Sequence, residues 1–281
     1  MGGPAPRVAE LLAEAGTLPG EEARREAEIL LCHVLAKPRS YLFAWPEAEV
    51  DAASAARFRA GLRARREGRP LAYLLGRREF WSLTLAVNEA TLIPRADTEL
   101  LVERALALEL PRGARVVDLG TGSGAIALAL ARERPAWQVT GVDVSAAALA
   151  VARANGEALG LARVRWLCGS WFGPVPGERF DLVISNPPYV APGDPHLARG
   201  DLRFEPRSAL VADGDGFACL EAIIGAAPAH LVPGGWLAVE HGAAQGEGVR
   251  QRLTGAGFAA VTSYRDLAGH ERATLGRRPD A

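Results

Sequence analysis

From Arg115 onward the chain alternates short apolar runs with helical stretches, and this repetition limits the possible fold more than any other feature. Apolar runs typical of strands occupy 116–119, 139–142, 164–167, 180–185, 236–240, 260–264 and 273–275. Helical spacing is found over 124–134, 145–159, 216–230 and 246–256. Alternation of this kind indicates an α/β fold, a parallel sheet with helices on both faces. Ligands of such sheets bind outside the carboxyl ends of the strands.

The first 75 residues predict a separate, small helical module. Apolar residues follow helical spacing from Val8 to a stop at Gly16, and a second helix is expected over 21–36. Asp51 is a suitable N-cap for a third helix that runs to about Gly68. The segment 80–87 alternates with a period of two and predicts a hairpin. We therefore expect a helical domain over 1–75, a β-hairpin linker over 76–97 and an α/β domain over 98–281.

The overall charge argues against a chain that binds nucleic acid through a general excess of basic residues. Its 281 residues carry 32 basic and 33 acidic side chains, a formal net charge of −1. One local exception is Arg57–Arg78, which holds eight arginines and a single acid, Glu67. This basic run is either a docking surface for an acidic protein or RNA, or a solvated helix face in an Arg-rich chain.

Cysteine and histidine usage gives no support for a disulfide framework or a structural metal. The three cysteines are far apart without CxxC spacing, and the five histidines lack zinc-ligand spacing. The N-terminus has no basic stretch followed by an apolar one, and no apolar run approaches the roughly 20 residues that span a bilayer. These features favour a soluble, cytoplasmic protein.

A glycine-rich loop follows the first strand of the α/β part and opens a helix. Its sequence is Asp118-Leu119-Gly120-Thr121-Gly122-Ser123-Gly124. Glycines permit positive φ and a close approach of the backbone to a ligand, and the helix N-terminus offers free N–H groups. The loop also matches the GxGxxG/A fingerprint of dinucleotide sites. It therefore indicates a nucleotide-type ligand without choosing which one, and a tight turn without a ligand is the remaining alternative.

Two further residues fit an adenosine ligand. Asp143 ends the second of these strands, where its carboxylate can accept both hydroxyls of a ribose; its alternative role is that of a helix N-cap. Trp171 lies just past the third strand, where its ring can pack against adenine or serve as an ordinary core residue.

The sequence Asn186-Pro187-Pro188-Tyr189 ends the strand over 180–185 and indicates the chemistry. Each proline holds the residue before it extended, so the loop is stiff and can aim acceptors. The Asn186 side-chain carbonyl and the Pro187 main-chain carbonyl can accept both N–H bonds of a planar amino group, on which Tyr189 can pack. Such a nitrogen is a poor nucleophile, so alignment with an electrophilic methyl group is the help it needs. Asn occurs three times in the chain, at Asn88, Asn155 and Asn186.

Together these motifs resemble the S-adenosylmethionine-dependent methyltransferases that modify planar nitrogen, and more specifically the bacterial release factor glutamine methyltransferases of the HemK/PrmC family. The resemblance is strong over about residues 70–278. The matching stretches are 79–81, Thr91–Glu99, Asp118–Leu130, Ser185–Val190, Gly200–Arg207 and Glu240-His241-Gly242.

The resemblance implies a Rossmann-like class I methyltransferase domain, with a seven-stranded, mostly parallel sheet, preceded by the small helical domain. It implies S-adenosylmethionine as cofactor, held by the glycine-rich loop (Gly120, Thr121, Gly122, Ser123, Gly124), Asp143, Trp171 and Asn186, with S-adenosylhomocysteine as product. Asn186, Pro187, Pro188 and Tyr189 would hold the substrate amide, with Asn186, Pro187 and Tyr189 catalytic. The segment 92–95 would form a lid. Ser170 stands where many members have an acidic residue, which puts a contact from that side chain to adenine in doubt.

The implied substrate is the glutamine of the Gly-Gly-Gln motif in peptide chain release factors, which the N-terminal helices would dock. The nearest alternative is a DNA adenine methyltransferase, because the adenine amino group suits the same pair of acceptors. Such an enzyme needs a basic surface and a target-reading region, which the net charge and the short N-terminal module argue against. An NAD-dependent dehydrogenase and a binding module without turnover are the more distant alternatives. His241 is interpreted as structural rather than catalytic.

Overall fold

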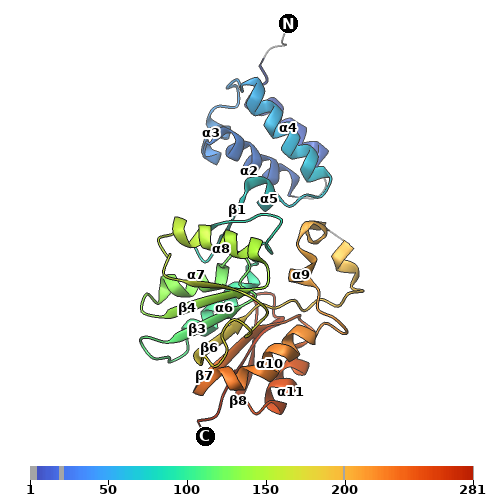
Figure 1. The fold of residues 1–281 in the computed structure, drawn as a ribbon. Coiled ribbons are helices and arrows are strands. Elements are labelled where there is room, and N and C mark those ends of the chain that lie inside the picture. Colours follow the sequence, from blue (N-terminus) through green and yellow to red (C-terminus); the bar gives the residue numbers. More distant parts are fainter. Residues whose placement is uncertain (1–4, 19–21, 199, 281) are drawn as a thin grey trace. The chain divides into compact units, whose positions relative to one another are not determined.

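The computed structural model describes residues 5–18, 22–198 and 200–280 (Figure 1). The chain divides into two compact units. The first consists of Met1–Gly76 together with His196–Phe204, and the second of Arg77–Pro195 together with Glu205–Ala281. No helix in these described stretches is long and apolar enough to cross a membrane.

The first unit is helical, as the sequence predicts. Its helices are α1 (Val8–Ala13), α2 (Ala23–Leu35), α3 (Arg39–Ala44), α4 (Ala52–Arg66) and α5 (Leu71–Leu75), with 3-10 turns at Glu14–Thr17 and Gly200–Phe204. Their apolar faces meet in one core that includes the fully buried Leu11, Leu31 and Phe58. The predicted cap of α4 is confirmed, because the Asp51 carboxylate accepts a hydrogen bond from the Ser54 N–H at 2.9 Å. The short helices α3 and α5 were not predicted.

Part of the basic run Arg57–Arg78 is neutralised within this unit. Arg59 pairs with Glu14 at 2.7 Å. Arg65, with only 20% of its side chain exposed, pairs with Glu26 at 2.8 Å and with Asp201 at 3.2 Å. These ion pairs tie α4 to neighbouring elements of the same unit, so the run is not a uniformly solvated helix face.

The second unit is built around one seven-stranded sheet, with strand order β5-β4-β3-β6-β7-β9-β8. The strands are β3 (Arg115–Leu119), β4 (Gln138–Asp143), β5 (Arg165–Cys168), β6 (Phe180–Ser185), β7 (Leu231–Glu240), β8 (Ala259–Arg265) and β9 (Glu271–Arg277). Pairing is parallel from β5 to β7, and β9 is antiparallel to both β7 and β8. The predicted seven-stranded, mostly parallel sheet is therefore confirmed.

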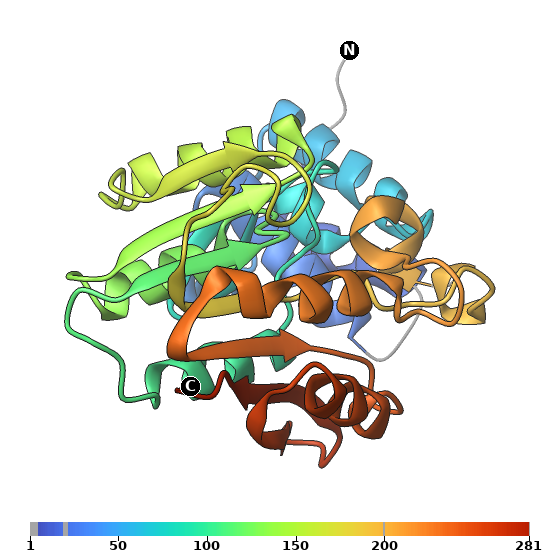
Figure 2. The ribbon, with the colours of Figure 1, turned by 60° about the horizontal axis from the view of Figure 1, so that its bottom comes forward.

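The central strands are largely apolar because both of their faces are covered by helices (Figure 2). Val116 and its neighbour Val117 are both fully buried, but they point into different cores. The Val116 core includes α6 and α7, and the Val117 core includes α10 and α11. The helices of this unit are α6 (Asp97–Leu106), α7 (Ala125–Glu133), α8 (Ala146–Ala158), α9 (Arg207–Leu210), α10 (Ala218–His230) and α11 (Gly246–Gly255).

The predicted hairpin is present, although it starts earlier than expected. Strands β1 (Arg77–Phe80) and β2 (Leu83–Ala86) pair antiparallel. The two residues of the turn, Trp81 and Ser82, have φ values of 51° and 55°. This is the left-handed conformation that two-residue hairpin turns favour, adopted here without the Asn-Gly or Gly signal that usually announces it. The position of the turn was therefore not readable from the sequence.

The sheet topology brings five strand ends to one edge. The mutually parallel strands β3, β4, β5, β6 and β7 end at Leu119, Asp143, Cys168, Ser185 and Glu240. Strand β3 lies between β4, which follows it in the chain, and β6, so the direction of the sheet connections changes beside β3. This change of direction is the position at which open α/β sheets bind their ligands.

Candidate functional site

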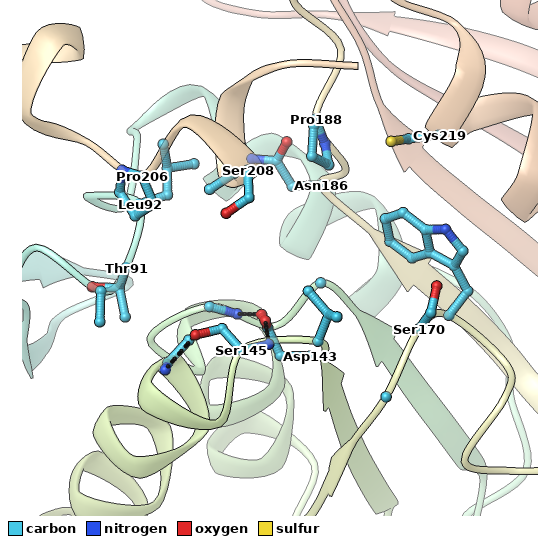
Figure 3. Close-up of a pocket in the computed structure, with 18 residues that line it drawn as sticks. Thr91, Leu92, Asp143, Ser145, Ser170, Asn186, Pro188, Pro206, Ser208 and Cys219 are labelled. Atoms are coloured by element: carbon cyan, nitrogen blue, oxygen red, sulfur yellow. Dashed lines mark hydrogen bonds between the residues drawn. The ribbon is translucent and has the colours of Figure 1, made fainter. Parts of the chain in front are cut away.

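A pocket opens at this edge of the sheet (Figure 3). It encloses about 840 Å³ when the space open to solvent is included. Asp143 and Ser145 lie on one side of it, and Asn186 and Pro188 lie on the other. Of the residues predicted to form the site, the pocket is lined by Gly120, Gly122, Asp143, Trp171, Asn186 and Pro188.

The remaining residues of the glycine-rich loop shape the loop behind the pocket wall. The hydroxyl of Thr121 is turned inward and donates to the Asp118 carboxylate at 2.6 Å. The carbonyl of Ser123 accepts a hydrogen bond from the Asn155 side chain at 2.9 Å. Gly124 has φ +84° and its position leaves no room for a side chain, since an added Cβ would lie 2.9 Å from the Trp166 ring. A glycine is therefore required there for structural reasons.

The backbone N–H groups of this loop are mostly used inside the protein. Gly120 and Thr121 both donate to the carbonyl of Val142, at 2.8 and 3.0 Å, and Gly124 donates to the carbonyl of Thr121 at 2.8 Å. Gly122 donates to the Asp143 carboxylate at 2.8 Å. These four N–H groups are therefore not free for a ligand, and of the expected free N–H groups at the start of α7, those of Gly124 and Ala127 are used inside the protein. A ligand diphosphate would find few donors here, which disfavours the dinucleotide alternative.

Asp143 is held by two backbone donors. One oxygen accepts from Gly122 in the loop after β3, and the other accepts from the Ser145 N–H at 2.8 Å. Each oxygen retains capacity for a further hydrogen bond, because a carboxylate accepts about four. The carboxylate is half-buried in the pocket wall and is the only charged group among the described lining residues. A site with one negative charge and no Lys or Arg suits a cationic or neutral ligand better than a phosphate.

Gly120 leaves space for a ligand next to Trp171. Gly120 has φ +73°, and an added Cβ would lie 3.6 Å from the Trp171 ring and 3.9 Å from the main-chain carbonyl of Asn186. A side chain at this position would therefore enter the space between the loop and the ring. Ser170 also lines the pocket and offers a hydroxyl. The glycine, the half-buried indole and the Asp143 carboxylate therefore all line one space that is open to a ligand.

The side chain of Asn186 is oriented from behind by α6. Its amide nitrogen donates to the hydroxyl of Thr98 at 3.1 Å, and Thr98 is buried in the first turn of that helix. Because the nitrogen is used in this way, the amide oxygen of Asn186 remains available as an acceptor. The next residue, Pro187, is buried, and Pro188 lines the pocket.

Tyr189 is directed toward Glu240 at the end of β7. Its hydroxyl donates to Oε1 of Glu240 at 3.2 Å, and its ring is not among the lining groups of the pocket. Burial and the adjacent Glu240 carboxylate raise the pKa of Tyr189, so it remains a neutral donor. Burial also raises the pKa of Glu240 to about 7, although hydrogen bonds from Thr98 and Tyr189 oppose this shift.

The buried carboxylate of Glu205 joins two segments of the pocket wall. It accepts a hydrogen bond from the Ile93 N–H at 3.0 Å and pairs with Arg95. The residues just before Ile93, Thr91 and Leu92, line the pocket, and so does Pro206 on the other segment (Figure 3). Glu205 has no exposed side-chain surface, so this contact fixes the predicted lid segment 92–95 against the stretch that begins α9.

The buried carboxylate of Asp118 lies under the loop. Burial raises its pKa to about 7. It accepts from the Thr121 hydroxyl and from the Ala127 N–H, at 2.6 and 3.2 Å.

Both nitrogens of the His241 imidazole are engaged in hydrogen bonds, 3.0 Å from the Gly242 carbonyl and 2.8 Å from the Thr274 hydroxyl. This geometry supports the structural interpretation of His241. No cluster of three or more metal-ligating side chains exists in the part of the chain that the structure describes.

The sequence analysis assigned no role to Thr98, Glu205 or Cys219. Of these three residues, Cys219 lines the pocket. Thr98 and Glu205 lie within stretches quoted for the family resemblance, and that was the only available signal for them. Their importance arises from contacts with residues 88 and 112 positions away in the chain. Local periodicity carries no information on such contacts.

Comparison with known proteins relates both parts of the chain to one family. The model of the PrmC N-terminal domain matches residues 7–76, and that of the methyltransferase small domain matches residues 96–215. A release factor glutamine methyltransferase of Xylella fastidiosa is 52% identical over 257 residues, which cover 91% of this chain and 94% of the relative. One of Vibrio cholerae is 50% identical over 253 residues, with 90% and 88% covered.

A solved structure shares the fold of the second unit. It is the T. thermophilus 16S rRNA N2 G1207 methyltransferase (RsmC) in complex with AdoMet and guanosine, with a TM-score of 0.51. The sequences are 21% identical, and the match covers 72% of this chain and 49% of that chain. At this identity the likeness concerns the fold alone, which is that of a methyltransferase.

Proposed function

The chain belongs to the family of the release factor glutamine methyltransferases, and we propose that it methylates the side-chain amide nitrogen of the glutamine in the Gly-Gly-Gln motif of peptide chain release factors. It is an S-adenosylmethionine-dependent protein-glutamine N-methyltransferase with a Rossmann-like class I methyltransferase domain. The observation that carries the proposal is that Asn186 and Asp143 face each other across one pocket (Figure 3).

The residues on the Asp143 side would hold the cofactor. Asp143 would accept hydrogen bonds from the ribose hydroxyls, Trp171 would pack beside adenine, and Gly120 and Gly122 would let the methionine part approach the backbone. When bound, S-adenosylmethionine supplies an electrophilic methyl group and leaves as S-adenosylhomocysteine. The single negative charge in the lining supports a ligand whose reactive centre is cationic.

The residues on the Asn186 side would hold the substrate amide. Its two N–H bonds would be donated to the Asn186 side-chain oxygen and to the Pro187 main-chain carbonyl. An amide nitrogen is a weak nucleophile because its lone pair is delocalised, so the gain comes from holding it in line with the methyl group in a water-poor pocket. Tyr189, which donates to Glu240 and does not itself line the pocket, would support this wall from behind. Methyl transfer needs no general base before the bond forms.

The remaining assignments concern the partner and the place of action. Residues 1–75 would dock the release factor, residues 76–97 would link the two domains, and residues 98–281 would carry the reaction. The net charge of −1 supports a protein substrate, and DNA is not expected to bind. We assign the protein to the cytoplasm, where release factors act in translation.

The test compares two classes of substrate in separate reactions. The protein is incubated with S-adenosylmethionine labelled in its methyl group, together with a purified release factor or with double-stranded DNA that contains adenine in many contexts. Label in the release factor, lost when the glutamine of its Gly-Gly-Gln motif is replaced by alanine, supports the proposal. Label in the DNA, or label that survives the glutamine replacement, overturns it.

A further inference from the structure

The side chain of Gln245, the residue just before α11, forms hydrogen bonds to the main chain of three separate segments. Its amide nitrogen donates to the carbonyl of Tyr189 at 3.2 Å and to the carbonyl of Gly216 at 3.4 Å. Its amide oxygen accepts from the Gly242 N–H at 2.8 Å. One side chain therefore joins the loop after β6, the segment before α10 and the turn after β7.

The partners of Gln245 determine which way its amide faces. A main-chain N–H only donates and a main-chain carbonyl only accepts. The end of the amide that meets Gly242 must therefore be the oxygen, and the end that meets the two carbonyls must be the nitrogen. This orientation depends on no titratable group, so it is the same at any pH at which the protein is folded.

Two glycines allow the main chain to come this close to the Gln245 amide. Gly216 has φ +89°, and an added Cβ would lie 2.5 Å from the Tyr189 carbonyl oxygen and 3.1 Å from Nε2 of Gln245. At Gly242 an added Cβ would lie 3.1 Å from Oε1 of the same side chain. The amide is therefore closely enclosed by the segments that it joins.

Gln245 holds the Asn186–Tyr189 loop at the end where the chain leaves it. The two prolines of this loop have no N–H, so no main-chain donor can fix them. Directly after them, the Tyr189 carbonyl is held by Gln245, and the Val190 N–H donates to the Leu210 carbonyl at 3.0 Å. The path of the loop after its prolines therefore depends on the Gln245 side chain.

We propose that Gln245 is a positioning residue for methyl transfer, which fixes the direction of the Pro187 carbonyl by holding the carbonyl of Tyr189. The proline rings fix φ at positions 187 and 188, so a shift of the Tyr189 carbonyl is passed on to that of Pro187. The inference rests on the proposed function, in which the Pro187 carbonyl accepts one N–H bond of the substrate amide. A displaced acceptor would turn the amide nitrogen out of line with the methyl group.

Two variants of Gln245 separate this role from a local structural one. Gln245→Leu removes all three hydrogen bonds. Gln245→Glu keeps the acceptor for Gly242, but at about pH 8 it places a carboxylate oxygen, which cannot donate, against the carbonyls of Tyr189 and Gly216. The matched control is Gln251→Leu, because Gln251 is an exposed residue of α11 whose side chain bonds only to Glu247 among the hydrogen bonds described, at 3.2 Å.

In release factor methylation at this pH, kcat of both Gln245 variants is expected to fall by about 10–100-fold, because small displacements of a reacting group carry losses of this size. The Gln251→Leu control retains the wild-type kcat. Cofactor affinity, measured by calorimetry, stays at the wild-type value in all three variants, because Asp143 and the glycine-rich loop are unchanged. If Gln245→Leu does not fold, Gln245→Glu carries the test, since it keeps the bond to Gly242.

Hydrogen exchange gives a second readout that does not depend on activity. The Val190 amide hydrogen, measured by mass spectrometry of a peptide that contains it, should exchange about tenfold faster in both Gln245 variants, because the adjacent anchor is lost. In Gln251→Leu it should exchange at the wild-type rate. A role confined to the turn at Gly242 predicts instead that Gln245→Glu behaves as the wild type in both kcat and exchange.

The inference is overturned if Gln245→Glu keeps kcat within about twofold of the wild type, or if exchange at Val190 is unchanged in both Gln245 variants. A cofactor Kd that rises as much as kcat falls would also overturn it, because the effect would then not be confined to the substrate side. Failure of the proposed function is a different result, since the wild type itself would not label the release factor.

Discussion

The Asp143 carboxylate accepts a hydrogen bond from the Gly122 N–H at 2.8 Å, which joins the end of β4 to the loop after β3. These two segments are 21 residues apart in the chain and lie on neighbouring parallel strands. The bond gives Asp143 two roles, because the carboxylate orders the glycine-rich loop and still keeps hydrogen-bonding capacity for a ligand in the same pocket.

Asp143→Ala is expected to weaken cofactor binding as its main effect. The loss is about 10–100-fold in Kd, because hydrogen bonds to a charged group contribute about 1.5–3 kcal/mol. Isothermal titration with S-adenosylmethionine measures it. Asp181→Ala is the matched control, since Asp181 also accepts a backbone N–H bond, from Arg115 at 2.7 Å, but does not line the pocket. An unchanged Kd in Asp143→Ala would refute the ribose-binding role.

Glu205→Ala is expected to lower both stability and cofactor affinity. It leaves the Ile93 N–H without a partner and releases Arg95, at a cost of about 1–3 kcal/mol in the free energy of unfolding. Glu28→Ala is the control: Glu28 is also buried and pairs with two arginines, Arg24 and Arg39, but it belongs to the helical unit. Urea unfolding and calorimetry should show a stability loss in both variants and an affinity loss only in Glu205→Ala. Equal cofactor affinities of Glu205→Ala and Glu28→Ala would exclude a role for Glu205 in the pocket wall.

Glu240 makes stability depend on pH. Its pKa is about 7 in the folded protein against an ordinary value of 4.5, so folding favours the protonated form. The associated stability is fully present below the ordinary value and is lost as the pH rises through about 7. Asp97 opposes ionisation of Glu240, and Arg272, Thr98 and Tyr189 favour it. Between about pH 5 and pH 8, the wild type should therefore lose more unfolding free energy than Glu240→Gln, by up to a few kcal/mol. Unfolding free energies of the wild type and Glu240→Gln that change equally with pH would contradict this.

Gly124→Ala is expected to destabilise the fold, in contrast to Gly113→Ala. At Gly124 the positive φ alone costs a non-glycine residue about 1–2 kcal/mol, and the new Cβ would also lie 2.9 Å from Trp166. At Gly113 nothing lies within 4 Å of an added Cβ. Urea unfolding of both variants measures the difference, and equal stabilities would show that the loop adapts to a side chain.

The sheet and its glycine-rich loop could be predicted because their signals are local. Strands such as β3 and β6 are buried on both faces and consist largely of apolar residues, and three glycines mark the loop. The stiff Asn186–Tyr189 loop was predictable for the same reason, since two prolines restrict it. The internal use of the backbone N–H groups was not predicted, because their acceptors, the Val142 carbonyl and the Asp143 carboxylate, lie on the neighbouring strand.

The contacts that orient the site could not be predicted from the sequence. Glu205 and Glu240 are buried carboxylates, and nothing in their local pattern indicates burial, since isolated charged residues are normally exposed. Thr98 lies in a helix that was not predicted. Asn155, one of three Asn in the chain, bridges the backbone of Ala86 and Ser123, which a count of Asn residues does not show.

The role of Asn186 in holding the substrate amide is the centre of this account. Methyl transfer to a release factor is measured for the wild type and Asn186→Ala, with cofactor affinity and thermal unfolding as checks on the fold. Near-complete loss of transfer, with the folded state retained, is the predicted result. Turnover that remains at the wild-type rate would contradict the assignment.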